Sequence, residues 1–268
     1  MSEYKGIKGF QVQTREDDPS PTEAQAGDFY YNSSTGQFKV ITDGGAPIGT
    51  WASGGNTNTA RLGINGGAGT QTAGLSAGGS SGDPASDTKL ATAEQFNGST
   101  WTEVGDLNTG RRELAGVGTS SSNAMAISGQ ASTDNVTNVE SWDGSSWTEI
   151  ADVNSGRSED PGAGGSNSSA VFFGGNDSGG TNVIDYVTIQ SAGNATDFGD
   201  STSNQSNASG TSDSIRGVFS AGYYGSPHLS NVIEKVIIQS TGNSVDYGDL
   251  IDERIQGGST SDSHGGLS

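Results

Sequence analysis

The residues TAEQFNGSTWTEVGDLNTGR at 92–111 recur, at ten of twenty positions, as NVESWDGSSWTEIADVNSGR at 138–157. A second pair of stretches follows the same plan. NVIDYVTIQSAGNATDFGD at 182–200 matches NVIEKVIIQSTGNSVDYGD at 231–249 at twelve of nineteen positions. A unit of about fifty residues that is copied along a Gly-rich chain is typical of propellers and other β-arrays. We therefore expect an all-β fold that is built from repeats.

One large aromatic residue marks each copy, with gaps of 50, 46, 51 and 49 residues between successive copies. These landmarks are Trp51, Trp101, Trp147, Phe198 and Tyr247. We expect the rings to pack between neighbouring sheets, because a fixed position in a repeat is what such packing requires. The alternative is a set of rings that stack on sugars.

Each unit also contains a strand of small and apolar residues that ends in glycine. These strands are expected at 73–78, 124–129, 170–174 and 217–222. An alternating strand follows a variable loop in each unit. Asn97-Gly98 and Asp143-Gly144 then predict two-residue type I′ turns, which need positive φ at both central residues.

The two ends of the repeat region each carry half a unit. Residues 264–268 fall 48 positions after 216–220, so the chain ends within a fifth glycine-terminated strand, whereas Trp51 has no such strand before it. Joining the two halves in one sheet would remove exposed strand edges. We predict a propeller of five blades over residues 51–268, closed by pairing the C-terminal strand with a strand from 28–55.

Residues 1–50 are expected to form an anchor segment. Within it, DFYYNSSTGQFKVITD at 28–43 predicts a β-hairpin with its turn at 32–36. The stretch Asp17-Asp18-Pro19-Ser20-Pro21 resists both helix and central strand. A polar terminus of this kind is expected to be held by a partner chain or by a neighbouring copy of the same chain.

The composition limits the classes of function. The chain of 268 residues is 29 % hydrophobic, carries a formal charge of −19 and has no cysteine. Such a charge repels nucleic acid and anionic membranes, and no disulfide or thiol nucleophile is available. No run approaches the roughly 18 apolar residues of a membrane span, and the N-terminus lacks the apolar run of a signal peptide. We expect synthesis and folding in a cytoplasm.

The small apolar strand that ends in Gly78-Gly79, followed by Phe96 and then Trp101, resembles the kelch-type β-propeller repeat. The stretch NGSTWTEVGDLNTGR looks like a repeat of the kelch-like proteins of tailed marine bacteriophages, of the cyanophage type. The stretch GDFYYNSSTGQFKV is similar to a hairpin near the front of phage fibre and appendage proteins. In two units the second glycine of the pair is read as Gln130 or Tyr223. The resemblance implies a virion structural protein with a kelch-like propeller.

Four arginines recur near the ends of the units, and Gln205 takes their place in the fourth unit. They are Arg61, Arg111, Arg157 and Arg254. We expect them to form ion pairs between blades with the recurring aspartates Asp106, Asp152, Asp200 and Asp249. The alternative is a channel lining that binds an anion such as a sulfated glycan.

Candidate sites for catalysis and metal binding are sparse. His228 and His264 have no paired spacing, so no transition-metal site is expected. The 31 acidic residues could hold Ca²⁺, but no EF-hand loop or Gly–Asp nonapeptide run is present. The stretch SWDGSSW at 141–147 differs from a sialidase Asp-box by one residue of spacing. We predict no enzymatic activity and no cofactor.

The most variable parts of the repeat are the loops after the glycine-terminated strands, at 79–91, 130–137, 175–181 and 223–230. Loops that differ on one rim of a fixed scaffold are the natural binding surface. One of these loops carries aromatic rings, and its residues Tyr223, Tyr224, Pro227 and His228 are the first candidates for contact with a host-surface glycan.

The sequence therefore predicts a non-enzymatic virion protein, a tail fibre, appendage or particle-surface component, that is assembled in the host cytoplasm. The expected partners are other virion proteins through residues 1–50, further copies of the chain and a host-surface glycan. Two functions stay open beside it: a capsid decoration or adaptor without host contact, and a propeller enzyme that degrades glycans.

Overall fold

The computed structural model describes a chain of strands and turns. The described residues are 13–18, 29–40, 54–63, 66–70, 72–83, 86–159, 162–165, 169–177, 179–188, 193–213, 215–223 and 228–257. The chain divides into two compact units between Gly54 and Gly55, and each unit is described by itself. No helix long and apolar enough to cross a bilayer occurs in the described ranges.

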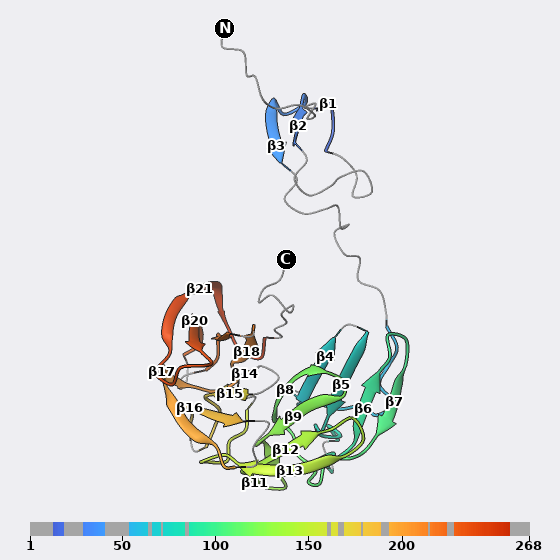
Figure 1. Ribbon diagram of the computed structural model, residues 1–268, viewed down its shortest axis with the longest axis vertical. Helices are drawn as coiled ribbons and strands as arrows, with labels where there is room; N and C mark the ends of the chain where they lie inside the picture. The colour runs from blue at the N-terminus through green and yellow to red at the C-terminus, as the bar shows by residue number, and fades with distance from the viewer. Residues whose placement is uncertain are drawn as a thin grey trace. The chain divides into compact units, whose positions relative to one another are not determined.

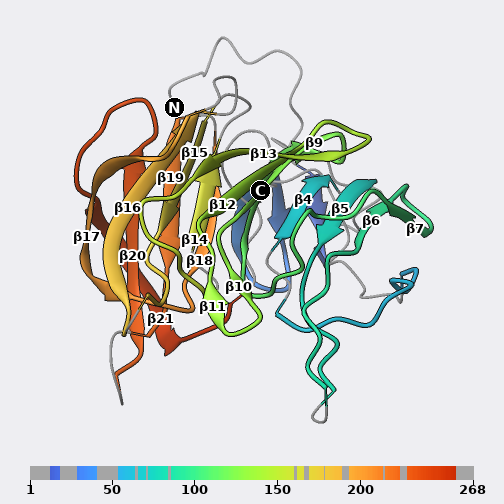
Figure 2. The same cartoon turned by 90° about the horizontal axis from the view of Figure 1, so that it is seen from below.

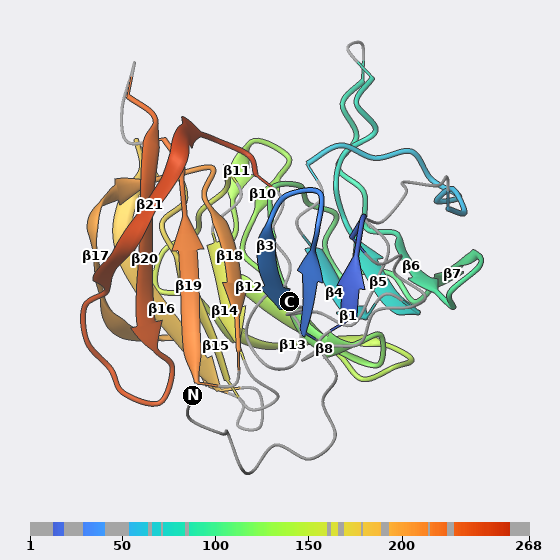
Figure 3. The ribbon, with the colours of Figure 1, turned by 90° about the horizontal axis from the view of Figure 1, so that it is seen from above.

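The N-terminal unit holds a sheet of three strands (Figure 3). Strand β2 (Phe29–Asn32) pairs antiparallel with β3 (Gln37–Val40), which is the predicted hairpin, and parallel with β1 (Gln13–Arg15). The carboxylate of Asp18 accepts hydrogen bonds from Lys39 Nζ, Tyr30 Oη and Asn32 Nδ2, each at 2.8 Å. The bonds from Lys39 first, and then those from Tyr30 and Asn32, lower the pKa of Asp18 to about 2.

The second unit contains four antiparallel sheets, each of four strands in chain order (Figure 1). The first sheet consists of β4 (Gly66–Thr70), β5 (Ala73–Ala77), β6 (Ala93–Phe96) and β7 (Trp101–Val104). The second consists of β8 (Ala115–Ser120), β9 (Asn123–Ile127), β12 (Asn138–Trp142) and β13 (Trp147–Asp152). A short hairpin, β10 (Gln130–Ala131) with β11 (Asp134–Asn135), lies between β9 and β12 along the chain.

The other two sheets follow the same plan with longer outer strands. The third consists of β14 (Gly162–Gly165), β15 (Ser169–Phe173), β16 (Thr181–Thr188) and β17 (Thr196–Gln205). The fourth consists of β18 (Ser209–Ser212), β19 (Arg216–Ser220), β20 (Ser230–Ile237) and β21 (Val245–Arg254). The glycine-terminated strands that the sequence predicts are thus the second strand of each sheet.

The first strands of successive sheets touch one another: β4 contacts β8, β8 contacts β14 and β14 contacts β18. The last strands fan outward from them (Figures 1 and 2). Small residues allow this close approach, because a Cβ placed on Gly118 of β8 would come within 2.8 Å of the Ala68 side chain in β4. The glycine content of the first strands therefore serves the packing of sheet beside sheet.

The hydrophobic core is divided into three clusters, each between two neighbouring sheets. Leu75, Trp142 and Trp147 belong to the cluster between the first and second sheets. The cluster between the second and third sheets includes Phe172, and that between the third and fourth includes Phe198. Each sheet needs only a few inward side chains, which explains how a chain with so few hydrophobic residues can fold.

Two local expectations are wrong in detail. The connection after Phe96 has four residues, and only Gly98 has positive φ, so the turn is not type I′. Asn97 Oδ1 instead accepts hydrogen bonds from the N–H groups of Ser99 and Thr100. Asp143 makes the equivalent contacts in the second sheet, with N–H groups two and three residues ahead.

The glycine pairs are also displaced by one residue from the sequence-based alignment. Ser128-Gly129 and Ala221-Gly222 occupy the place of Gly78-Gly79, and all six residues have positive φ. It is therefore the first glycine that is replaced, not the second as read from Gln130 and Tyr223. The second position stays glycine because a Cβ on Gly129 would lie 2.8 Å from the carbonyl oxygen of Arg112.

The five aromatic landmarks do not share one structural position. Trp147 packs toward the first sheet, whereas Phe198 packs toward the fourth. Trp147 precedes Arg157 by ten residues, but Phe198 precedes Gln205 by only seven, and the β16–β17 register is irregular. Trp101 is half-buried, Tyr247 is 52 % exposed, and Trp51 lies outside the described residues.

The fold is thus all-β, with four repeated antiparallel sheets in the second unit. The predicted closing strand at the C-terminus falls within 258–268, outside the described residues.

Candidate functional site

Three of the four arginines of the repeat, Arg61, Arg111 and Arg157, are buried. The fourth, Arg254, is exposed, and its Nη2 lies 4.0 Å from Asp252 Oδ2 on the same strand, so it does not form the expected pair between sheets. Arg61 Nη2 lies 2.6 Å from Glu94 Oε1, and Arg111 Nη2 lies 3.1 Å from Glu140 Oε1. Arg157 pairs with Asp185 in the same way. The acidic partner is in each case on the third strand of the following sheet. The expected pairing with Asp106, Asp152, Asp200 and Asp249 is therefore wrong, although the expectation of ion pairs between sheets is correct.

An asparagine three residues before each of the three buried arginines donates a further hydrogen bond to the same carboxylate. The N–H groups of Asn58 and Thr59 donate to Glu94 at 2.7 and 3.0 Å. Burial raises the pKa of Glu94, but these bonds and Arg61 outweigh it, so the net pKa is lowered. Asn108 donates from its N–H to Glu140 at 2.7 Å, and Asn154 donates from its side-chain Nδ2 to Asp185 at 2.6 Å. We call the motif Asn-x-x-Arg with its acceptor the junction grip.

Arg157 also contacts the backbone and an aromatic ring of the following sheet. Its Nη1 donates to the carbonyl oxygens of Gly174 at 3.1 Å and Val183 at 2.9 Å, and its guanidinium lies 5.1 Å from the ring centre of Phe172. Burial lowers the pKa of Arg157 and raises the pKa of Asp185, while their mutual attraction opposes both shifts. Because the guanidiniums of Arg61, Arg111 and Arg157 are buried, these three cannot line an open anion channel.

The junction between the third and fourth sheets has no arginine. Gln205 is 2 % exposed, and its Nε2 lies 3.4 Å from Glu234 Oε2. Glu234 also accepts hydrogen bonds from the N–H of Thr202 at 2.9 Å and the hydroxyl of Ser244 at 3.3 Å. Neutral donors therefore satisfy this buried carboxylate where a guanidinium serves elsewhere.

The residue after each of the three buried arginines, and the one after Gln205, forms a reciprocal pair of backbone hydrogen bonds with the following sheet. The pairs are Leu62 with Ser80, Arg112 with Gln130, Ser158 with Asn176 and Ser206 with Tyr223. Tyr223 is thus a junction residue, because its N–H and carbonyl both bond to Ser206, at 2.8 and 2.9 Å.

The next residue of each junction has a positive φ. In three junctions its N–H donates a hydrogen bond to the carbonyl oxygen of the equivalent residue in the preceding junction. Glu113 donates from its N–H to Gly63 at 3.0 Å, Asn207 to Glu159 at 2.6 Å and Gln256 to Asn207 at 3.0 Å. Within the described ranges, no such bond joins Glu159 to Glu113. The series is therefore interrupted between the second and third sheets.

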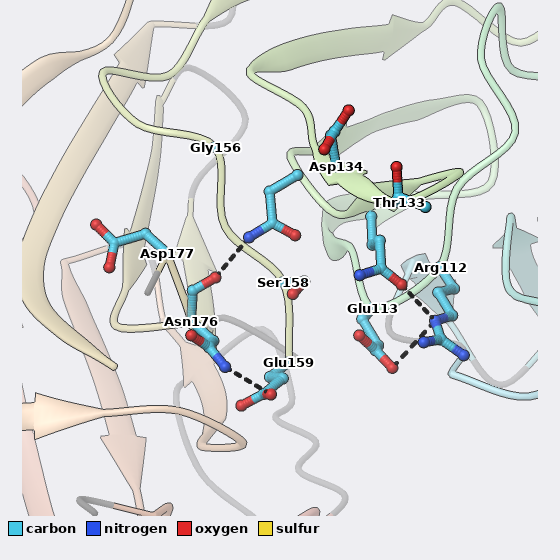
Figure 4. A pocket seen from close by; sticks show the side chains of 11 residues that line it. Arg112, Glu113, Thr133, Asp134, Gly156, Ser158, Glu159, Asn176 and Asp177 are labelled. Carbon is cyan, nitrogen blue, oxygen red and sulfur yellow. Dashed lines mark hydrogen bonds and ion pairs between the residues drawn. The ribbon is translucent and has the colours of Figure 1, made fainter. Parts of the chain in front are cut away.

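A polar pocket lies at this interruption (Figure 4). Its volume is about 590 Å³, within the range of about 300–1,000 Å³ that small-molecule sites occupy. The lining residues are Arg112, Glu113, Gln130, Thr133, Asp134, Asn135, Gly156, Ser158, Glu159, Asn176 and Asp177. Two of the variable loops, 130–137 and 175–181, supply half of its wall, so the pocket lies on the predicted binding rim.

Several of these side chains form hydrogen bonds or ion pairs with one another (Figure 4). Glu159 Oε1 accepts from Asn176 Nδ2 at 2.6 Å, and Asn135 Nδ2 donates to the Asn176 carbonyl at 2.7 Å. Arg112 Nε donates to Gln130 Oε1 at 3.1 Å and lies 3.3 Å from Glu113 Oε1. The pocket wall is thus a preformed set of amides, carboxylates and hydroxyls.

No protein-family model and no curated protein matches this sequence. The site is therefore interpreted from its own geometry.

The residues favoured by the sequence lie elsewhere. Tyr223 is half-buried in its junction and His228 is exposed, while Tyr224 and Pro227 lie outside the described residues. The pocket residues gave no motif that would single them out, but the loops 130–137 and 175–181 were among those predicted. Over the part of the chain that the structure describes, no group of three His, Cys, Asp or Glu side chains could hold a metal ion.

Proposed function

We propose that this chain is a non-enzymatic structural protein of a tailed-phage particle, an appendage or surface component that presents variable loops on a rigid propeller. The observation that carries the proposal is the junction grip. It occurs before the first sheet and at the first–second and second–third contacts, and so provides a stiff frame, while the loops on one rim differ from unit to unit. The proposed location in a phage particle rests on the resemblance of the repeats and of the N-terminal hairpin to phage proteins.

The scaffold of this proposal is a kelch-like propeller of five blades, closed by strands from both termini. Two observations support closure. Arg61 and Asn58 grip Glu94 as the end of a preceding sheet would, although Gly55–Arg61 begin the unit. At the other end, Tyr247 is 52 % exposed, whereas its equivalent Phe198 is 3 % exposed beneath the fourth sheet.

Closure predicts that Tyr247→Ala lowers the free energy of unfolding by about 2–4 kcal/mol, because a fifth sheet would bury the ring as Phe198 is buried. Denaturant unfolding monitored by circular dichroism measures this change, with Phe198→Ala as the matched comparison. An effect of Tyr247→Ala below about 0.5 kcal/mol, as expected for an exposed site, would show that nothing covers this face and would remove the closed ring.

The location is tested on particles. A chain that lacks residues 1–25 loses β1 and Asp18 from the N-terminal sheet. It is expected to keep the unfolding midpoint of the second unit but to be missing from purified particles. The physical reason is that residues 13–18 belong to none of the core clusters of the second unit, whereas a polar terminal segment is suited to binding a neighbour. Immunogold labelling of particles that carry the full chain locates it on tail or capsid. Absence of the full-length protein from purified particles contradicts the proposal.

A further inference from the structure

We propose that the pocket between the second and third sheets binds a saccharide that carries hydroxyl groups and no acidic group. This inference deepens the proposed function, on which its biological setting rests, by naming a site and a class of ligand. It is carried by three features of the pocket: a serine hydroxyl that lines it, a wall of neighbouring donors and acceptors, and an excess of negative charge.

The hydroxyl belongs to Ser158. The residue is 5 % exposed and lines the pocket, and its backbone is fixed by two hydrogen bonds to Asn176. Among the described residues its Oγ has no hydrogen-bond partner, and the atom is accessible from the pocket. The buried serine at the preceding junction differs, since Ser128 Oγ donates to Val136 and accepts from the N–H of Arg157, both at 2.8 Å. A hydroxyl that faces the pocket and uses no described partner remains available to a ligand or to water.

The wall around Ser158 offers donors and acceptors side by side. Gln130 uses only its Oε1 toward Arg112, so its Nε2 group is free to donate. Asn135 uses its Nδ2 toward Asn176, which leaves its Oδ1 to accept. Thr133 adds a hydroxyl to the lining (Figure 4). Adjacent donors and acceptors of this kind suit the neighbouring hydroxyls of a sugar ring, each of which both donates and accepts.

The charge of the pocket sets the class of saccharide. Four carboxylates line it, Glu113, Asp134, Glu159 and Asp177, against the single guanidinium of Arg112. That guanidinium is already engaged by Asp87 at 2.9 Å and Glu113 at 3.3 Å. An incoming carboxylate or sulfate would meet like charges without a free cation. Uronic acids, sialic acids and sulfated sugars are therefore excluded by repulsion.

The test uses the full chain and a printed array of oligosaccharides of two to four rings. The array holds neutral sugars built from glucose, galactose, mannose and N-acetylglucosamine, together with uronic-acid and sulfated counterparts. We expect binding to one or more neutral sugars and none to the acidic ones. Calorimetric titration with the best neutral sugar then gives the affinity of each variant.

Ser158→Ala is expected to lower that affinity by about threefold to tenfold, which is the usual effect of one hydrogen bond. Its unfolding midpoint should stay at the wild-type value, since Oγ has no partner among the described residues. The matched control is Ser128→Ala, which should lower the unfolding midpoint and leave the affinity of the folded protein unchanged. Equal affinities for Ser158→Ala and wild type would overturn the proposed role of the pocket.

The charge argument has its own pair of variants. Asp134→Arg places a cation at the exposed mouth and is expected to admit an acidic sugar that the wild type rejects. Glu103→Arg changes the net charge equally on the exposed face of β7 and should leave the selectivity unchanged. Failure of every neutral sugar to bind, or preference of the wild type for acidic sugars, overturns this inference. Neither result touches the presence of the protein on particles, which is measured separately.

Discussion

Replacing Arg157 with alanine is expected to lower the free energy of unfolding by about 3–5 kcal/mol, which is the usual cost of leaving one partner of a buried ion pair alone. The carboxylate of Asp185 would remain buried with Asn154 Nδ2, 2.6 Å away, as its donor. The carbonyl oxygens of Gly174 and Val183 would lose their guanidinium donor as well. Denaturant unfolding at neutral pH measures the loss.

Arg216→Ala is the matched control for this change. Arg216 pairs with Asp213 at 2.7 Å, but its side chain is 41 % exposed, so its removal should cost less than about 1 kcal/mol. The double variant Arg157→Met with Asp185→Leu removes both charges and should recover most of the loss. If Arg157→Ala costs no more than Arg216→Ala, the grip is not a source of stability.

Trp142→Ala is expected to cost about 3–5 kcal/mol, because it opens a cavity at the contact between the first and second sheets. The ring is 1 % exposed, and its centre lies 5.4 Å from that of Trp147. Its Nε1 donates to the Ser121 carbonyl at 2.9 Å, so the change also removes a hydrogen bond. Thermal and denaturant unfolding both report the effect.

The control for Trp142 is Phe38→Ala, which removes a ring that is 74 % exposed in the N-terminal unit. This change should move the free energy of unfolding by less than about 0.5 kcal/mol. A Trp142→Ala variant that unfolds at the wild-type denaturant concentration would contradict the assignment of the core to the contacts between sheets.

The repeat could be predicted from the sequence because identical residues recur at a nearly constant interval. That interval predicts the repeated strands and their order, and the N-terminal hairpin follows separately from the alternating residues and turn of 28–43. The exact alignment of the units could not be obtained in this way. Trp147 and Phe198 look equivalent in the sequence, yet an irregular register in the third sheet makes them face opposite neighbours.

The acidic partners of the arginines were missed for a related reason. Asp106 and Asp152 recur close to the arginines in sequence, whereas Glu94 and Glu140 come into reach of Arg61 and Arg111 only through the contact of one sheet with the next. A signal was present, because an acidic residue occupies the third strand of all four sheets, at Glu94, Glu140, Asp185 and Glu234. The pocket has no such signal, since it arises from one hydrogen bond that is absent from a repeating series.

The junction grip also bears on how such chains can gain, lose or exchange units. Each arginine needs only a carboxylate at one place in whichever sheet comes next, so a unit that ends in Asn-x-x-Arg can be followed by any unit with that acid. Duplication or recombination in frame would then yield compatible neighbours without further change. The step from Gln205 to Glu234 breaks this rule. The fourth sheet still carries the acid, so a hybrid chain that places an arginine-ended unit before it is expected to form an ion pair with Glu234, where this protein has only neutral donors.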